Sequence, residues 1–205
     1  MGEKSEPTAS QTQAAPPQFS APRTLKVCYK SWKSSGIRIL DAANEEHELY
    51  NIKVSLHKPH MTFFDTTTAT ATGATTGAVI GTANFHLLHC DIDVTVRGNP
   101  LKLAARGTWK TRYVYRSPAL GGATLTWKTD SCCTGDFSCS DERDVVVARF
   151  YFSVYSWKQV GRLELLLAPG VGNEAAAAAE ELMVVGLALA EKTIGNRLAA
   201  STVVV

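Results

Sequence analysis

The chain lacks the short motifs that mark the commonest catalytic and metal sites. It has no Gly-x-Ser-x-Gly nucleophile elbow, and no Gly-Lys-Ser/Thr ending follows Gly73, Gly77 and Gly81 to make a phosphate loop. It also has no Cys-x-x-Cys pair and no EF-hand loop. We therefore expect no catalytic residue, no cofactor and no metal, and we predict a protein that is not an enzyme.

The chain also lacks an excess of charge of either sign. Its 21 Lys and Arg residues stand against 19 Asp and Glu, which gives a net charge of +2 over 205 residues. A nonspecific nucleic-acid binder usually has a strong basic bias, so no nucleic-acid partner is expected. With 45% hydrophobic and 20% charged residues, the chain can form one core of ordinary domain size.

The N-terminal segment has little apolar character. After Met1, residues 1–24 contain Phe19 as their one large apolar side chain and four of the eight prolines, so we expect a disordered tail there. No signal-peptide pattern is present, and the five cysteines are an odd number. We expect reduced thiols and a cytoplasmic location.

The middle of the chain has the pattern of consecutive strands. Short segments rich in β-branched and aromatic residues alternate with Gly, Pro, Asn and Asp. No helical segment interrupts them, which favours an antiparallel barrel or sandwich over a parallel sheet. The expected strands are 25–30, 36–40, 48–56, 61–65, 78–82, 84–88, 92–96, 101–105, 109–116, 124–128, 145–153 and 160–167.

One helix is expected after these strands, over about residues 174–196, with Asn173 as its N-cap and residues 199–205 as a C-terminal tail. Its segment 182–190 has no polar side chain on any face, so it must be enclosed. The segment is too short to span a membrane, which takes about 20 apolar residues. We therefore predict a mainly β fold, a closed antiparallel barrel of about 12 strands wrapped around a central hydrophobic C-terminal helix.

Three segments occur in an order that resembles a known superfamily. They are 146–150 (VVARF), 161–165 (GRLEL) and 181–189 (ELMVVGLAL), and Trp109 and Trp127 also fit. Over about residues 25–198 the chain is similar to the tubby C-terminal-like superfamily, which includes tubby domains, LURP-one-related proteins and phospholipid scramblases. The resemblance implies a barrel closed around its own helix. For some members it also implies binding of phosphoinositides or other anionic lipids, and it implies no settled catalytic residues.

The strongest local charge asymmetry lies between Val94 and Thr129, a segment that contains seven cations and no acid. Alternate residues of a strand share a face, so two neighbouring strands could present these cations together. We expect an anionic membrane lipid or another phosphate group to bind there, with docking at the periphery of the plasma membrane. The alternatives are a solvated outer face and an acidic protein partner. The candidate binding residues are Lys102, Arg106, Lys110, Arg112 and Arg116.

A hydrolase with an unrecognised site would require a deep polar pocket at a His or Cys, and two other functions are also compatible with the same sequence. One is a scramblase-like membrane protein whose C-terminal helix inserts into the bilayer, although the acidic calcium segment and N-terminal cysteine cluster of scramblases are absent. The other is a protein-interaction scaffold without a lipid ligand. The acidic segment 130–144, with Cys132, Cys133 and Cys139, is expected to be a flexible solvated loop and not an ion site. The pairs His57/His60 and His86/His89 are not expected to bind a metal.

Overall fold

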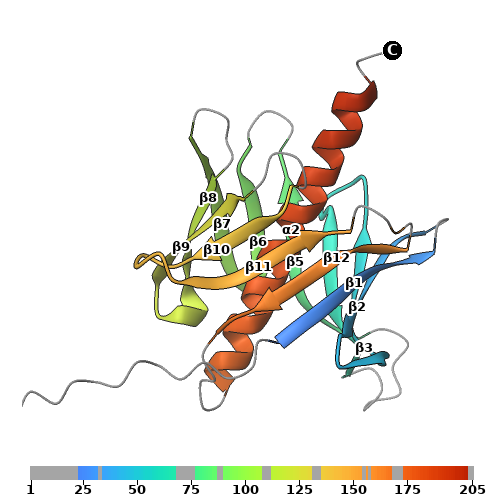
Figure 1. The fold of residues 1–205 in the computed structure, drawn as a ribbon, viewed down its shortest axis with the longest axis horizontal. Helices are drawn as coiled ribbons and strands as arrows, with labels where there is room; N and C mark the ends of the chain where they lie inside the picture. The colour runs from blue at the N-terminus through green and yellow to red at the C-terminus, as the bar shows by residue number, and fades with distance from the viewer. Residues whose placement is uncertain are drawn as a thin grey trace, which may run out of the picture.

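Twelve antiparallel strands of the described chain close into one barrel (Figure 1). The computed structural model describes residues 23–31, 34–67, 77–86, 90–107, 112–130, 135–153, 156, 158–167 and 173–202. Each strand pairs with its neighbours in sequence, and β1 closes the barrel by pairing with β12. The strands are β1 (Arg23–Ser31), β2 (Ser34–Asp41), β3 (Asn44–Val54), β4 (Met61–Asp65), β5 (Ala78–Phe85), β6 (Ile92–Val96), β7 (Asn99–Arg106), β8 (Arg112–Ser117), β9 (Ala123–Thr129), β10 (Phe137–Ser140), β11 (Val146–Phe152) and β12 (Gln159–Leu165).

The helix α2 (Asn173–Thr202) runs through the barrel, as Figure 1 shows. Every residue from Glu181 to Ala190 is buried, and α2 contacts β5, β6, β11 and β12. Burying each large apolar side chain of this segment stabilises the fold by about 1.5–3 kcal/mol. The predicted closed barrel around a central hydrophobic helix is therefore confirmed.

Close approach between α2 and the barrel wall depends on glycine at two positions. A Cβ on Gly186 would lie 3.0 Å from Cη2 of Trp127, whose side chain is almost fully buried. A Cβ on Gly81 of β5 would lie 3.1 Å from a methyl group of Val184. The helix and the strands thus pack at distances that leave no room for a side chain at either position.

The observed elements differ from the expected ones in several places. Segments 78–82 and 84–88 were expected as two strands, but β5 runs without a break from Ala78 to Phe85. Strand β10 lies inside the segment expected to be a loop. The helix continues to Thr202, because one glycine, Gly195, costs only about 1 kcal/mol inside a helix. At the other end, Arg23 and Thr24 belong to β1, and the rest of the expected tail lies outside the described residues.

Candidate anion-binding surface

Three cations from three neighbouring strands lie side by side on the outer face of the barrel. Arg106 on β7 is directly opposite Arg112 on β8, and Arg112 is directly opposite Lys128 on β9. Directly opposed residues of an antiparallel pair have Cβ atoms about 4.5–5.5 Å apart. We call Arg106, Arg112 and Lys128 the basic row.

Strand alternation directs the basic row away from the core. On β7, Leu101 and Leu103 are buried against the helix side while Arg106 is exposed. On β8, Tyr115 is buried while Arg112 is exposed. Because successive side chains of a strand point to opposite faces, the apolar residues that build the core also position the cations outside it.

The basic row is an unfavourable arrangement of charge in the absence of an anion. Like charges directly opposite each other on a sheet destabilise the strand pair, and Arg112 has a like charge on both sides. Within the described part of the chain, none of the three cations forms an ion pair. An anion bound across the row would remove this repulsion, and arginine binds phosphate through two parallel hydrogen bonds.

A hollow of about 630 Å³ lies beside the basic row, and Arg112 and Lys128 form part of its lining. The turn after β10 adds the carboxylates of Asp141, Glu142 and Asp144 to the same lining, so the hollow itself is not basic. Two of the three carboxylates accept hydrogen bonds from backbone N–H groups. Asp141 accepts hydrogen bonds from the N–H groups of Arg143 and Val145, at 2.9 and 2.8 Å. Glu142 accepts one from the N–H of Thr124 at 2.9 Å, and hydrogen bonding from the Thr124 side chain, together with this backbone bond, lowers the pKa of its carboxyl.

The remaining sequence-predicted residues are placed apart from the basic row. Lys102 and Arg116 each lie four residues along the strand from Arg106 and Arg112, which corresponds to about 13 Å. The Lys102 ammonium is 3.5 Å from an Asp91 carboxylate oxygen, and its side chain is 69% exposed. Lys110 lies outside the described residues.

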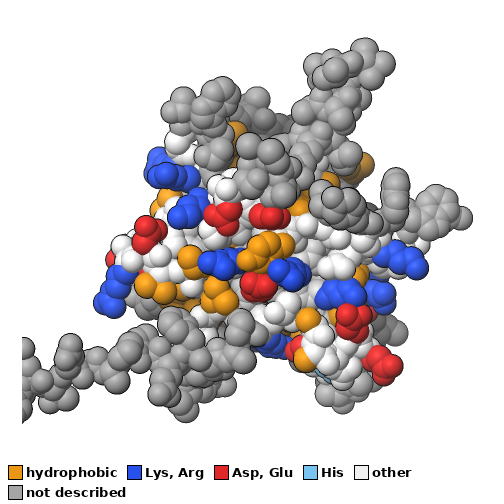
Figure 2. Space-filling model, in the orientation of Figure 1, with side chains coloured by type: hydrophobic (Ala, Val, Ile, Leu, Met, Phe, Trp, Pro, Cys, Tyr) orange, Lys and Arg blue, Asp and Glu red, His pale blue; other side chains and the backbone are white. Residues whose placement is uncertain are grey.

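On the face drawn in Figure 2, cationic and acidic side chains are interspersed. Figure 2 shows Lys and Arg side chains in separate groups with Asp and Glu between them, so no single basic face covers this side of the barrel.

Lys128 was not among the candidate residues, because its membership of the row depends on the register of β9 against β8. The signal was nevertheless present, since Lys128 lies in the same acid-free segment 94–129.

The acidic segment 130–144 is only partly a loop. Its strand β10 places Phe137 and Cys139 in the core, and burial raises the pKa of the Cys139 thiol strongly. The Ser138 hydroxyl donates to the Asp130 carboxylate at 2.7 Å. Cys132 and Cys133 lie outside the described residues. The expectation of a flexible solvated loop is therefore wrong for 137–140.

Two of the histidines with described positions, His60 and His86, have protein partners for their rings. Nδ1 of His60 accepts a hydrogen bond from the Phe85 N–H, at 3.1 Å. Nε2 of His86 lies 2.7 Å from a carboxylate oxygen of Asp93. Across the residues that the structure describes, no three His, Cys, Asp or Glu side chains are grouped so that they could hold a metal ion.

Known proteins show only weak similarity to this chain. No family model matches the chain, and no curated protein matches it. An X-ray structure of a protein from Arabidopsis thaliana is similar at 13% sequence identity and a TM-score of 0.40, covering 80% of this chain and 88% of that one. Among the described helical residues, no stretch is both long and apolar enough to cross a membrane.

Proposed function

We propose that this protein is a non-enzymatic, tubby-like binding module that docks on phosphoinositide or another anionic lipid through the basic row. The observation that carries the proposal is the direct opposition of Arg106, Arg112 and Lys128 across three strands. Such an arrangement costs stability in the free protein and becomes favourable when a phosphate binds across it. Each cation near an anionic membrane contributes about 1 kcal/mol, screened by salt.

The architecture supports the tubby-like part of the proposal at the level of the fold. A barrel of twelve strands closed around its own apolar helix is the arrangement that the resemblance implies. A fold accommodates many functions, so the lipid ligand is argued from the basic row and not from the barrel. The protein would then act at the cytoplasmic face of the plasma membrane, where anionic lipids are concentrated.

The position of α2 favours peripheral docking over a scramblase-like inserted helix. Residues Glu181 to Ala190 are buried by the strands of the barrel, and Trp127 and Leu163 lie against Gly186. Inserting this helix into a bilayer would require the barrel to open and lose its core. Docking through outward cations requires no such change.

Cosedimentation with vesicles tests the proposal. The wild-type protein should bind phosphatidylcholine vesicles that contain phosphatidylinositol bisphosphate, should bind plain phosphatidylcholine poorly, and should be released by high salt. The double reversal Arg106→Glu/Arg112→Glu should abolish the binding. The matched control Lys53→Glu/Arg149→Glu makes the same change in net charge elsewhere on the barrel and should keep most of it.

Three outcomes would contradict the proposal. Equal loss in both double variants would show that only net charge matters and not the basic row. Binding by neither the wild type nor the variants would favour a protein-interaction scaffold. Protein that stays with the vesicles in high salt and carbonate, and leaves only with detergent, would favour the inserted helix.

A further inference from the structure

A second cationic site lies on the other side of the barrel, where β1, β2 and the start of β12 meet. It is a hollow of about 670 Å³, a volume within the usual range of small-molecule sites. We call it the β1–β2 groove. Its charged lining consists of four cations and one carboxylate, and the residues are Lys26, Lys30, Arg38, Lys158 and Glu45.

The floor of the β1–β2 groove is buried although it faces outward. On β1 and β2 the residues directed into the barrel are Val27 and Ile39, so Cys28 and Leu40 point away from the core. Both outward side chains are nevertheless only 5% exposed. The outer face is therefore covered here by neighbouring segments and forms a concave site with an apolar floor.

One wall of the groove is fixed to β1 by hydrogen bonds. The Tyr29 N–H donates to the Lys158 carbonyl at 2.9 Å. The Ser156 hydroxyl oxygen accepts from the N–H groups of Lys158 and Gln159, at 3.3 and 3.1 Å. Lys158 is thus held over the groove by backbone geometry. Gln159 and Arg38 pair with Cys28 from its two sides.

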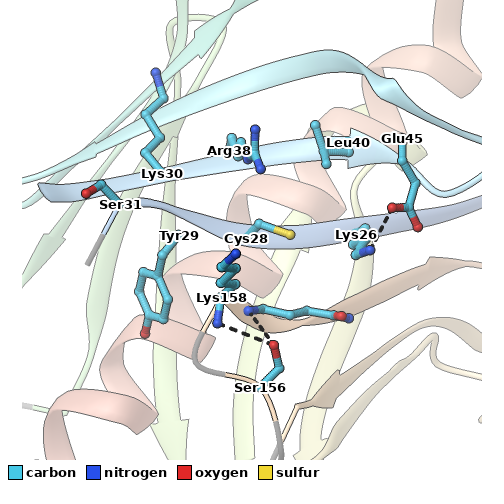
Figure 3. Close-up of a pocket in the computed structure, with 11 residues that line it drawn as sticks. Lys26, Cys28, Tyr29, Lys30, Ser31, Arg38, Leu40, Glu45, Ser156 and Lys158 are labelled. Atoms are coloured by element: carbon cyan, nitrogen blue, oxygen red, sulfur yellow. Dashed lines mark hydrogen bonds and ion pairs between the residues drawn. The ribbon is translucent and has the colours of Figure 1, made fainter. Parts of the chain in front are cut away.

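Two central cations of the groove, Arg38 and Lys158, form no ion pair within the described residues. Figure 3 shows both beside Cys28 in the middle of the groove. The two flanking cations do have acidic partners. Lys26 is paired with Glu45 at 2.8 Å, at one end of the groove in Figure 3, and Lys30 is paired with Glu48 at 3.7 Å. Burial raises the pKa of the Cys28 thiol, so the thiol stays neutral and does not offset these cations.

We propose that the β1–β2 groove binds a compact molecule bearing two or more phosphate monoesters, with Arg38 and Lys158 as the central phosphate contacts and Lys26 and Lys30 flanking them. The cations lie at both ends and in the middle, so one phosphate would leave some of them unused. The apolar floor of Cys28 and Leu40 accommodates the ring or chain that holds the phosphates. This site does not depend on the basic row, which lies on β7, β8 and β9.

Calorimetric titration of the full chain with soluble inositol trisphosphate tests the proposal. Arg38→Gln and Lys158→Gln should each weaken binding by about tenfold or more, because each removes a charge-assisted hydrogen bond. The matched controls are Arg149→Gln and Lys53→Gln, which remove a cation of the same type from other strands and should leave binding unchanged. Unfolding midpoints establish that all four variants are folded.

The thiol on the groove floor locates the ligand independently of any substitution. Bound trisphosphate should slow the alkylation of Cys28 by N-ethylmaleimide several-fold more than that of Cys139, the buried thiol of β10, measured on the two peptides by mass spectrometry. Alkylation of Cys28 at the same rate with and without saturating trisphosphate would overturn the proposal. Absence of binding, or undiminished binding by both Arg38→Gln and Lys158→Gln, would overturn it as well.

Vesicles containing phosphatidylinositol bisphosphate distinguish a lipid headgroup from a free ligand. Vesicle binding that is weakened by Arg38→Gln identifies a headgroup in the groove. Trisphosphate binding that is lost in Arg38→Gln while vesicle binding persists identifies a soluble ligand. Both results support the groove, and the second leaves the basic row as the separate membrane contact. A third result would separate the two proposals. If the wild type binds no trisphosphate, and vesicle binding is lost only when the cations of the basic row are reversed, the proposed groove ligand is overturned and the proposed function stands.

Discussion

Arg97 and Glu180 are joined by two parallel hydrogen bonds, from Nε to Oε2 at 2.5 Å and from Nη2 to Oε1 at 2.8 Å. Arg97 lies in the turn between β6 and β7 with a left-handed backbone, φ 46°, and Glu180 lies on α2 just before its buried segment. The pair therefore connects the β6–β7 turn to the helix next to its buried segment. Its carboxylate is only 11% exposed and raises the pKa of the Arg97 guanidinium.

Replacement of Arg97 should loosen the helix at this end. Arg97→Ala should lower the free energy of unfolding by about 1–2 kcal/mol, because it leaves a nearly buried carboxylate without its partner, while the half-exposed arginine limits the effect. Arg97→Lys keeps the charge but cannot form the two parallel hydrogen bonds. Its free energy of unfolding should therefore lie between those of Arg97→Ala and the wild type. Urea unfolding measures all three proteins. Equal stability of Arg97→Ala and wild type would show that the pair does not hold the helix.

Gly186 and Gly195 provide opposite tests of how tightly the barrel encloses α2. Gly186→Ala should destabilise the protein by about 1–3 kcal/mol, because its Cβ would press on the Trp127 ring. A Cβ on Gly195 meets nothing within 4 Å, so Gly195→Ala should stabilise the helix by about 0.4–1 kcal/mol. Thermal unfolding shows whether each variant stabilises or destabilises the protein. If Gly186→Ala stabilised it, the space between the helix and the barrel wall would be large enough for a methyl group.

Glu191 should make stability depend on pH. Burial raises the pKa of its carboxyl in the folded protein, so the folded state binds the proton more tightly than the unfolded state. The stabilising contribution is therefore complete below the ordinary glutamate pKa and is lost as the pH rises through the folded pKa. Glu191→Gln should stabilise the protein at neutral pH, and this gain should vanish in acid.

The control for Glu191 is Glu174 on the first turn of the same helix, which is exposed. Glu174→Gln should give no gain at neutral pH, and the loss of an acid near the helix N-terminus should cost a few tenths of a kcal/mol at most. Urea unfolding across the pH range separates the two. A gain from Glu191→Gln that is the same in acid and at neutral pH would contradict the assignment to ionisation.

Arg112 should lower the stability of the free protein while it contributes to ligand binding. Its like-charged neighbours on both sides predict that Arg112→Thr raises the free energy of unfolding by about 0.2–1 kcal/mol at low salt, and that high salt removes the gain. Arg149 on β11 is directly opposite Glu164, so Arg149→Thr should be neutral or destabilising. Denaturant titrations at two salt concentrations compare them. Similar effects of both substitutions would mean that repulsion in the row is already relieved in the free protein.

The sequence was sufficient to predict the barrel and its central helix, because the segment 182–190 has no polar face and is too short for a membrane. It was insufficient for β10, whose four residues Phe137–Ser140 are surrounded by acids and cysteines. Such a short strand is stabilised by pairing with β9 and β11 and not by its own pattern.

The candidate site was predictable only in part. Alternation placed the cations of β7 and β8 on the outer face, but the register that aligns Lys128 with Arg112 depends on where the turn between β8 and β9 forms. The β1–β2 groove could not be predicted at all. Lys26 and Lys158 are brought together because β12 pairs with β1 across more than a hundred residues of chain.

Chemical footprinting on vesicles tests the proposed docking surface most directly. Arginines are modified with phenylglyoxal and lysines with acetic anhydride, with and without vesicles that contain phosphatidylinositol bisphosphate, and the rate at each residue is read by mass spectrometry. We predict that vesicles slow modification of Arg106, Arg112 and Lys128 several-fold and leave Arg149 and Lys53 unchanged. Unaltered rates across the basic row on vesicle-bound protein, or equal protection of all five residues, would contradict it.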